Sequence, residues 1–134
     1  MNFLKETKNV IKESGHNLKD VMFIGSSNGE YRMNWDKFRD VADFEYDSGF
    51  GSQEIAVDLI IYFNDHTYIV RGEYDGSEWW EYNSPKLFNK NDIYKNFDIL
   101  GGTNFMWKTV EEMNNKEKYD ENGYRRERWY LVLK

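Results

Sequence analysis

The strongest alternation of hydrophobic and polar positions lies in the middle of the chain, over residues 55–63. One face of this segment is fully apolar and the opposite face is largely so, as in a strand from the interior of a sheet. Two turn signals follow, Asn64-Asp65-His66 and Asp75-Gly76, and each of them separates two strand-like runs. The pattern therefore predicts a three-stranded antiparallel meander over residues 55–82.

Ahead of the meander, the pattern predicts two helices and a hairpin. Residues 2–14 have apolar positions at helical spacing, and Gly15 is a natural stop. Residues 21–24 and 30–33 are strand candidates on either side of a Ser-Ser-Asn-Gly turn. Asn34 is expected to cap a second helix. The buried side of that helix would carry Trp35, Phe38, Val41 and Ala42.

Behind the meander, the pattern predicts two more helices. Asn91 or Asp92 would begin the first, and Gly101-Gly102 would close it. Its buried side would carry Ile93, Phe97 and Leu100. The spacing Thr109-x-x-Glu112 is that of a capping box, which predicts a helix that runs to Lys118.

These elements predict a single α+β domain over residues 1–134. We expect an antiparallel sheet of about 4–6 strands, made of the central meander 55–82, the first hairpin and a C-terminal strand over residues 126–133. The helices would pack mainly on one face of this sheet. With 134 residues, 40% of them hydrophobic, the chain is long and apolar enough for one core.

The composition excludes several classes of protein. Because the chain has no cysteine, it has no disulfide scaffold, thiolate metal site or cysteine nucleophile, and we expect no cofactor. A net charge of -6 argues against general binding to nucleic acid or to an anionic membrane. The first residues lack the apolar run of a signal peptide, and the longest apolar run, 59–63, is too short to span a bilayer. We therefore expect a cytoplasmic protein.

The charges are distributed unevenly along the chain. Residues 40–81 hold eleven acidic residues and one base, Arg71, for a net charge of −10; the remaining residues hold 17 basic and 13 acidic ones, for +4. The eleven acids are Asp40, Asp43, Glu45, Asp47, Glu54, Asp58, Asp65, Glu73, Asp75, Glu78 and Glu81. Because this block coincides with the predicted meander, its charges would be held in place by the fold.

Large aromatic residues gather in the same region, in a chain that is 18% aromatic. Strand alternation places Arg71 and Glu73 on one face of their strand, and Trp79 and Glu81 on one face of theirs. Fixed carboxylates and rings suit a basic surface of another protein, since they can take the positions of phosphates and bases. The candidate partner contacts are Asp47, Glu54, Glu73, Asp75, Glu78, Trp79, Trp80 and Glu81. An ordinary solvated sheet face, with the tryptophans packed inside, stays open as the alternative.

The end of the chain is basic and aromatic, with Arg125, Arg126, Arg128 and Lys134 among Tyr124, Trp129 and Tyr130. The favoured interpretation is that these arginines pair across strands with the acidic block. Contact with RNA or phosphate is the other interpretation, and the net charge opposes it, so we expect no direct nucleic-acid binding.

Carboxylates are the only catalytic groups present in number. Asp58 is expected to have a raised pKa, because it lies on a largely apolar strand, and it would serve either an active site or a structural hydrogen bond. His16 follows a helix end and His66 lies in a hairpin turn, and neither has a serine-plus-acid pattern beside it. Oxygen ligands for a divalent ion, at a spacing that matches no known metal loop, are offered by Asp47, Glu54, Glu73 and Glu78. These patterns form no enzyme constellation.

Two stretches of the central region carry a resemblance: residues 46–56, YDSGFGSQEIA, and residues 71–81, RGEYDGSEWWE. The pair resembles small uncharacterised proteins carried by phages and other mobile elements of low-GC Gram-positive bacteria. The resemblance implies a context and no catalytic role. Small acidic single domains of such elements often inhibit host defence, as anti-CRISPR proteins do when they occupy the nucleic-acid groove of an effector nuclease.

The expected function is therefore that of a non-enzymatic inhibitor from a phage or mobile element. It would bind a basic surface of a host protein, foremost a CRISPR effector nuclease, through the acidic and aromatic surface and by nucleic-acid mimicry. Two other functions stay open. One is a small carboxylate-based metal-dependent enzyme, and the other is a structural or oligomerising module that uses exposed tryptophans as a patch.

Overall fold

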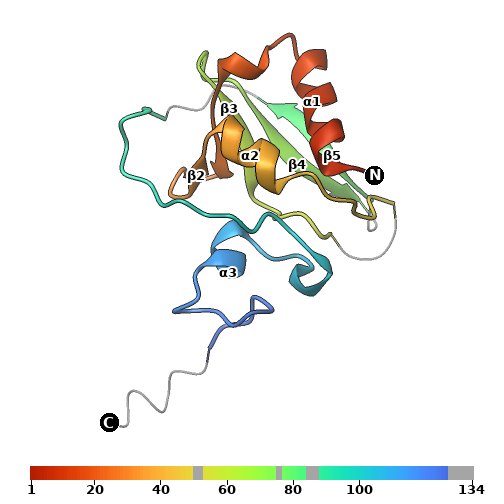
Figure 1. Ribbon diagram of the computed structural model, residues 1–134, viewed down its shortest axis with the longest axis vertical. Helices are drawn as coiled ribbons and strands as arrows, with labels where there is room; N and C mark the ends of the chain where they lie inside the picture. The colour runs from red at the N-terminus through yellow and green to blue at the C-terminus, as the bar shows by residue number, and fades with distance from the viewer. Residues whose placement is uncertain (50–52, 75–76, 84–87, 127–134) are drawn as a thin grey trace.

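A five-stranded antiparallel sheet forms the centre of the chain in the computed structural model, which describes residues 1–49, 53–74, 77–83 and 88–126 (Figure 1). The strands follow the order β2-β1-β3-β4-β5 across the sheet. Their bounds are β1 Val21–Ser26, β2 Arg32–Met33, β3 Leu59–Phe63, β4 Tyr68–Tyr74 and β5 Ser77–Asn83. Strands β3, β4 and β5 are the predicted meander, except that its first strand begins at Leu59 instead of Ile55. The predicted α+β architecture is confirmed.

Three α-helices lie in the described residues: α1 Phe3–Glu13, α2 Trp35–Val41 and α3 Val110–Asn114. Two short 3-10 turns, η1 Leu18–Asp20 and η2 Thr103–Phe105, complete the elements. Each α-helix begins at a residue whose side-chain oxygen accepts a backbone N–H three positions later, and these N-caps are Asn2, Asn34 and Thr109. The N-caps predicted at Asn34 and Thr109 are therefore confirmed.

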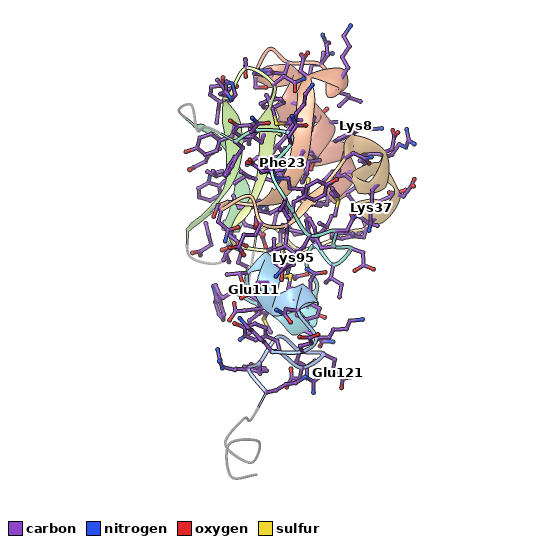
Figure 2. The ribbon with its side chains drawn as sticks, turned by 90° about the vertical axis from the view of Figure 1, so that its left-hand side faces the viewer. Lys8, Phe23, Lys37, Lys95, Glu111 and Glu121 are labelled. Atoms are coloured by element: carbon purple, nitrogen blue, oxygen red, sulfur yellow. The ribbon has the colours of Figure 1, made fainter. Side chains whose placement is uncertain are left out.

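Helices α1 and α2 lie across the same face of the sheet (Figure 1). Turned by 90°, the sheet and these helices form two layers, with Lys8 and Lys37 on the helix side and α3 below them (Figure 2). The main core fills the space between the layers, where Phe3 and Phe38 from the helices meet Ile61 from the sheet, all fully buried. The helices thus pack mainly on one face, as predicted.

The opposite face of the sheet has a smaller core of Phe23, Ile60 and Tyr62. Phe88 covers it, with its ring centroid 4.9 Å from that of Tyr62 and 5.5 Å from that of Phe23. Buried Arg32 holds this covering segment in place: its Nη1 donates to the Asn89 carbonyl at 2.9 Å, and its Nη2 pairs with Asp92 at 3.0 Å.

The helix predicted from Asn91 or Asp92 to Leu100 is wrong, because this segment starts in a turn and then continues without helix, with a single β-bridge at Lys95. Lys95 donates from its backbone N–H to the Glu30 carbonyl at 2.6 Å and accepts from Arg32 N–H at 2.8 Å. Phe97 and Leu100 are buried as expected, whereas Ile93 is 99% exposed. Asp92, one of the two residues that suggested a cap, instead closes a local turn, since its carboxylate accepts the Asn89 N–H at 3.1 Å.

Two further boundaries differ from the prediction. Helix α3 ends at Asn114 instead of continuing to Lys118, because Asn115 takes an extended ψ and the chain then turns. Of the strand expected over residues 126–133, residues 127–133 lie outside the described residues. In the described part of the chain, no helix has both the length and the apolarity to cross a membrane.

An acidic and aromatic groove as candidate functional site

Strand β5 divides the predicted contact residues between two faces of the sheet. Its register with β4 pairs Arg71 with Trp80 and Gly72 with Trp79. Because side chains alternate along a strand, Glu78 and Trp80 point toward the helices, and Trp79 and Glu81 point to the opposite face. The candidate contacts on β5 therefore do not share one face of the sheet.

The helix side of β5 encloses a buried charge cluster around Arg71. Its Nη2 donates to Glu78 Oε1 at 2.9 Å and to the Tyr46 hydroxyl at 3.0 Å, and its Nη1 lies 3.8 Å from Glu6 Oε2. The Arg71 and Glu78 side chains are both fully buried. The guanidinium also lies 4.8 Å from the Trp80 ring centroid, a cation–π contact. This cluster is a structural part of the core.

Glu78 uses both carboxylate oxygens inside this cluster. Besides Arg71, it accepts the backbone N–H of Glu54 at 2.7 Å and that of Ile55 at 3.2 Å, so it fixes the segment that leads into β3. Burial raises the pKa of Glu78, although these donors and Arg71 act in the opposite direction. The prediction that Glu78 contacts a partner is therefore corrected: its carboxylate is spent on the fold.

Trp80 requires the same correction. It is 7% exposed, its ring stacks on Phe3 at a centroid distance of 5.6 Å, and its Nε1 donates to Thr7 Oγ1 at 3.0 Å. A buried indole with its N–H satisfied is an anchor for α1 on the sheet. The alternative of tryptophans packed inside holds for this residue, although it also lines a surface groove.

Trp79 and Glu81 form a fixed pair on the opposite face. Trp79 Nε1 donates to Glu81 Oε1 at 2.9 Å, and the Glu81 side chain is exposed. Gly72 provides the space for this pair: a Cβ at that position would lie 2.5 Å from Trp79 Nε1 and 2.8 Å from Glu81 Cδ. The predicted shared face of Trp79 and Glu81 is thus observed, with a carboxylate and an indole held together.

A surface groove of about 280 Å³ runs between α1 and β5. It is lined by Met1, Glu6, Asn9, Val10, Glu13, Trp79 and Trp80. The charged side chains that line it are Glu6 and Glu13, of which Glu13 is exposed and Glu6 is occupied by Arg71 and the Tyr46 hydroxyl. We call this groove, together with Glu81 of the same strand, the β5 groove. Carboxylates and indole rings meet here without a basic side chain among the described lining residues.

A second acidic group lies near the turn between β4 and β5. Asp47 and Glu73 are exposed, and Glu73 stands opposite Glu78 in the register. The pKa of Glu54 is raised, first by partial burial and then by the charges of Glu78 and Asp47. Asp75, also a predicted contact, lies outside the described residues.

The remaining acids of the block have separate structural partners. Asp43 accepts from Asn2 Nδ2 at 2.9 Å, and Glu45 pairs with the amino group of Met1 at 3.4 Å. Asp58 accepts the Val110 N–H at 2.7 Å and so holds the start of α3. Burial raises the pKa of Asp58, as the sequence predicted. Its observed role is the structural hydrogen bond that the sequence left open.

The metal hypothesis finds little support in this geometry. Within the described residues, no three His, Asp or Glu side chains gather as a metal site would require. Glu78, one of the four proposed ligands, already accepts three hydrogen bonds.

Sequence reasoning missed a cluster around His16, whose ring is stacked on Phe63 at 3.8 Å. Its Nδ1 lies 3.0 Å from Ser14 Oγ and its Nε2 lies 2.8 Å from Asp65 Oδ2, although Asp65 is far away in sequence. Ser14 donates to the Ile11 carbonyl at 2.7 Å, at the C-terminal end of α1, where helix carbonyls oppose an oxyanion. The cluster therefore ties α1 to the β3–β4 turn and is unsuited to nucleophilic catalysis.

A second groove, about 640 Å³, lies on the face opposite the helices and is lined by Met22, Asn64, His66, Phe88, Asn89, Lys90 and Asp92. His66 has a positive φ of 70° in the β3–β4 turn, and its Nδ1 lies 2.7 Å from the Tyr62 hydroxyl. That hydroxyl accepts the Phe88 N–H at 2.8 Å. The groove forms because residues 88–92 cover this face of the sheet. The local sequence does not predict that contact.

The comparisons with known proteins return nothing: no protein-family model matches the chain, and no curated protein and no solved structure is significantly similar to it.

Proposed function

We propose that this chain is a non-enzymatic binding protein whose β5 groove contacts a basic surface of another protein. The observation that carries the proposal is the arrangement of Trp79 and Glu81, an indole fixed against an exposed carboxylate, on the strand whose Trp79 and Trp80 line a groove together with Glu13. A lysine or arginine side chain can lie on such a ring while its charge meets the carboxylate. A site held in this way before binding loses little conformational entropy on association.

The partner we propose is a CRISPR effector nuclease in the cytoplasm of a bacterial host, and the chain would act as its inhibitor. Such nucleases hold nucleic acid in a positively charged channel, whose lysines and arginines fit carboxylates in place of phosphates. The resemblance of residues 46–56 and 71–81 to proteins of phages and mobile elements favours this class of partner. Charge complementarity predicts fast association that weakens as salt rises.

A cleavage assay tests this function directly. The guide-loaded effector nuclease is mixed with its target DNA and with increasing amounts of the chain, and cleaved DNA is measured. We expect the wild-type chain to inhibit, and E13Q/E81Q to inhibit at least tenfold less, because two carboxylates of the β5 groove are neutralised. The matched control is E30Q/E121Q, which removes the same charge from two exposed positions elsewhere.

Two results would count against the proposal. If the wild-type chain leaves cleavage unchanged at every concentration, the effector nuclease is not its partner. If E13Q/E81Q and E30Q/E121Q inhibit equally, the β5 groove is not the contact surface. Circular dichroism of both variants shows that any loss of inhibition is not a loss of fold.

A further inference from the structure

Strand β5 forms one edge of the sheet, and the direction of its backbone groups can be assigned. In an antiparallel pair, the N–H and C=O groups of alternate residues point toward the partner strand and away from it. The Glu78 N–H donates to the Ser48 carbonyl at 2.9 Å, so this group points away from β4. Trp80 and Tyr82 lie two and four positions after Glu78, so their backbone N–H and C=O groups also point away from β4.

In the part of the chain that the structure describes, most of this outer edge has no backbone partner. Among the described residues, Ser48 provides the backbone partner at Glu78, and no described backbone group pairs with the outward groups of Trp80 or Tyr82. The Tyr82 side chain is 51% exposed. An edge strand with unpaired groups is a template for an added strand, and the β5 groove runs along this edge between α1 and β5.

We propose that an extended, basic segment of the partner adds to β5 as a sixth strand across Trp80 and Tyr82. This inference rests on the proposed function, which supplies a basic partner, and it specifies how that partner binds. Strand addition obtains affinity from main-chain hydrogen bonds and specificity from alternate side chains.

The side-chain environment on both sides of the edge identifies the chemistry of the added strand. Residues of that strand that point to the helix side would enter the groove beside Glu13 and the Trp80 ring. Residues that point to the other side would lie along Trp79 and Glu81. Lysine or arginine suits both sides, because the helix side offers the Glu13 carboxylate and the other side offers the Trp79 ring for the stem and the Glu81 carboxylate for the charge.

The test uses a synthetic peptide, acetyl-Lys-Thr-Lys-Val-Arg-Thr-Lys-amide, and the full chain as wild type, Tyr82→Pro and Tyr82→Ala. Proline at position 82 removes an outward N–H and leaves the bonds between β4 and β5 intact. Titration calorimetry should show that Tyr82→Pro binds at least tenfold more weakly than Tyr82→Ala. Amide hydrogen exchange on the wild-type chain should show that the peptide slows exchange at Trp80 and Tyr82. That readout stands even if Tyr82→Pro does not fold.

A second peptide, N-methylated at its three central amides, keeps the charge but loses the hydrogen-bonding groups. We expect it to bind at least tenfold more weakly. Equal binding of both peptides, with unchanged exchange at Trp80 and Tyr82, would overturn strand addition but leave the basic partner of the proposed function in place. A wild-type dimer in sedimentation that Tyr82→Pro dissolves would also overturn it, because a second copy would then occupy the edge. Loss of nuclease inhibition is a separate readout, which belongs to the proposed function.

Discussion

Trp79 and Trp80 are neighbours in sequence, yet their side chains lie in opposite environments on the two faces of β5. Trp80 is buried against Phe3, and its Nε1 bonds to Thr7 of α1. Trp79 lies on the other face, where its Nε1 bonds to exposed Glu81. The same contrast separates Glu78, fully buried against Arg71, from Glu81 three residues later.

The contrast shows that the charge of a segment does not measure the charge of a surface. Part of the net charge of −10 carried by residues 40–81 lies inside the protein and not on its surface. Glu78 pairs there with Arg71, and Asp58 accepts a hydrogen bond at the start of α3. Buried charges fix the position of β5, and the exposed residues of the same strand are then presented at fixed positions. The residues that hold the fold and those that offer a surface therefore alternate along one strand.

The largest expected effect of breaking this arrangement is on the buried side. Arg71→Met would leave Glu78 without its cation in the core, and removing one partner of a buried pair costs about 3–5 kcal/mol. The matched control is Arg39→Met, whose exposed pairs with Asp36 and Asp40 should contribute less than about 1 kcal/mol. Urea unfolding followed by circular dichroism measures both. Equal stability of the two variants would show that the buried cluster does not hold the fold.

The two tryptophans give a direct test of the two faces. Trp80→Phe should lose about 1–3 kcal/mol of stability, because it deletes the bond to Thr7 and leaves a gap beside Phe3. Trp79→Phe should lose less stability than Trp80→Phe, since the Trp79 side chain is only half-buried, but it should weaken partner binding. Thermal unfolding of both variants checks this, and the reverse order of stabilities would refute the assignment of faces.

The pH dependence of stability should separate buried from exposed acids. Burial raises the pKa of Asp58 above its ordinary 3.8, so the folded chain holds that proton more tightly than the unfolded chain. Its contribution is then most favourable at low pH and falls as the pH rises through the raised pKa. Bonds from Thr67 and His16 lower the pKa of Asp65 to about 2, so its contribution is present above 3.8 and is lost as the pH falls through about 2.

The melting temperature as a function of pH distinguishes these two acids. Asp58→Asn keeps an oxygen that accepts the Val110 N–H, so it should raise the melting temperature at pH 7 and change it little at pH 3. Asp65→Asn should lower the melting temperature at pH 7 and change it little at pH 2. The same sign for both variants at pH 7 would contradict the distinction.

The smallest effect on stability is expected on the exposed face. Gly72→Ala would push the Trp79 indole and Glu81 apart, because the new Cβ would lie 2.5 Å from Trp79 Nε1. Glu81 is exposed and Trp79 is only half-buried, so we expect both side chains to shift and stability to change by less than about 1 kcal/mol. The Trp79 indole N–H signal in a two-dimensional NMR spectrum should shift, and binding to a basic partner should weaken. An unchanged indole signal would mean that the pair is not held as observed.

Local signals predicted the elements with strong caps and the meander. Asn34 and Thr109 each accept a backbone N–H from the first turn of their own helix, so these caps need no distant partner. The strand over residues 59–63 is buried at every position, and an apolar run of this kind is visible in the local sequence. The prediction of a helix over residues 91–100 was wrong because the hydrogen-bond partners of this segment are distant in sequence. Lys95 pairs with Glu30 and Arg32, and Phe97 and Leu100 are buried without a helix.

The candidate site was predicted only in part, for the same reason. Alternation correctly placed Trp79 beside Glu81, because both lie on one strand. Which of the two tryptophans is buried depends on where α1 docks, and Thr7 is 73 positions away from Trp80. The partnership of Glu78 with Arg71 depends in turn on the register of β4 and β5, which the strand sequences do not specify alone.

Photo-crosslinking tests the central claim, that a basic partner contacts the β5 groove, most directly. The photoreactive residue p-benzoylphenylalanine replaces Trp79 in one chain and Tyr124, which is 61% exposed and lies beyond α3, in another. Each chain is irradiated in an extract of a bacterial host, and the adducts are identified by mass spectrometry. We expect an adduct at position 79 with a basic protein, at low salt and not at high salt. Adducts only at position 124, or only with a second copy of the chain, would contradict it.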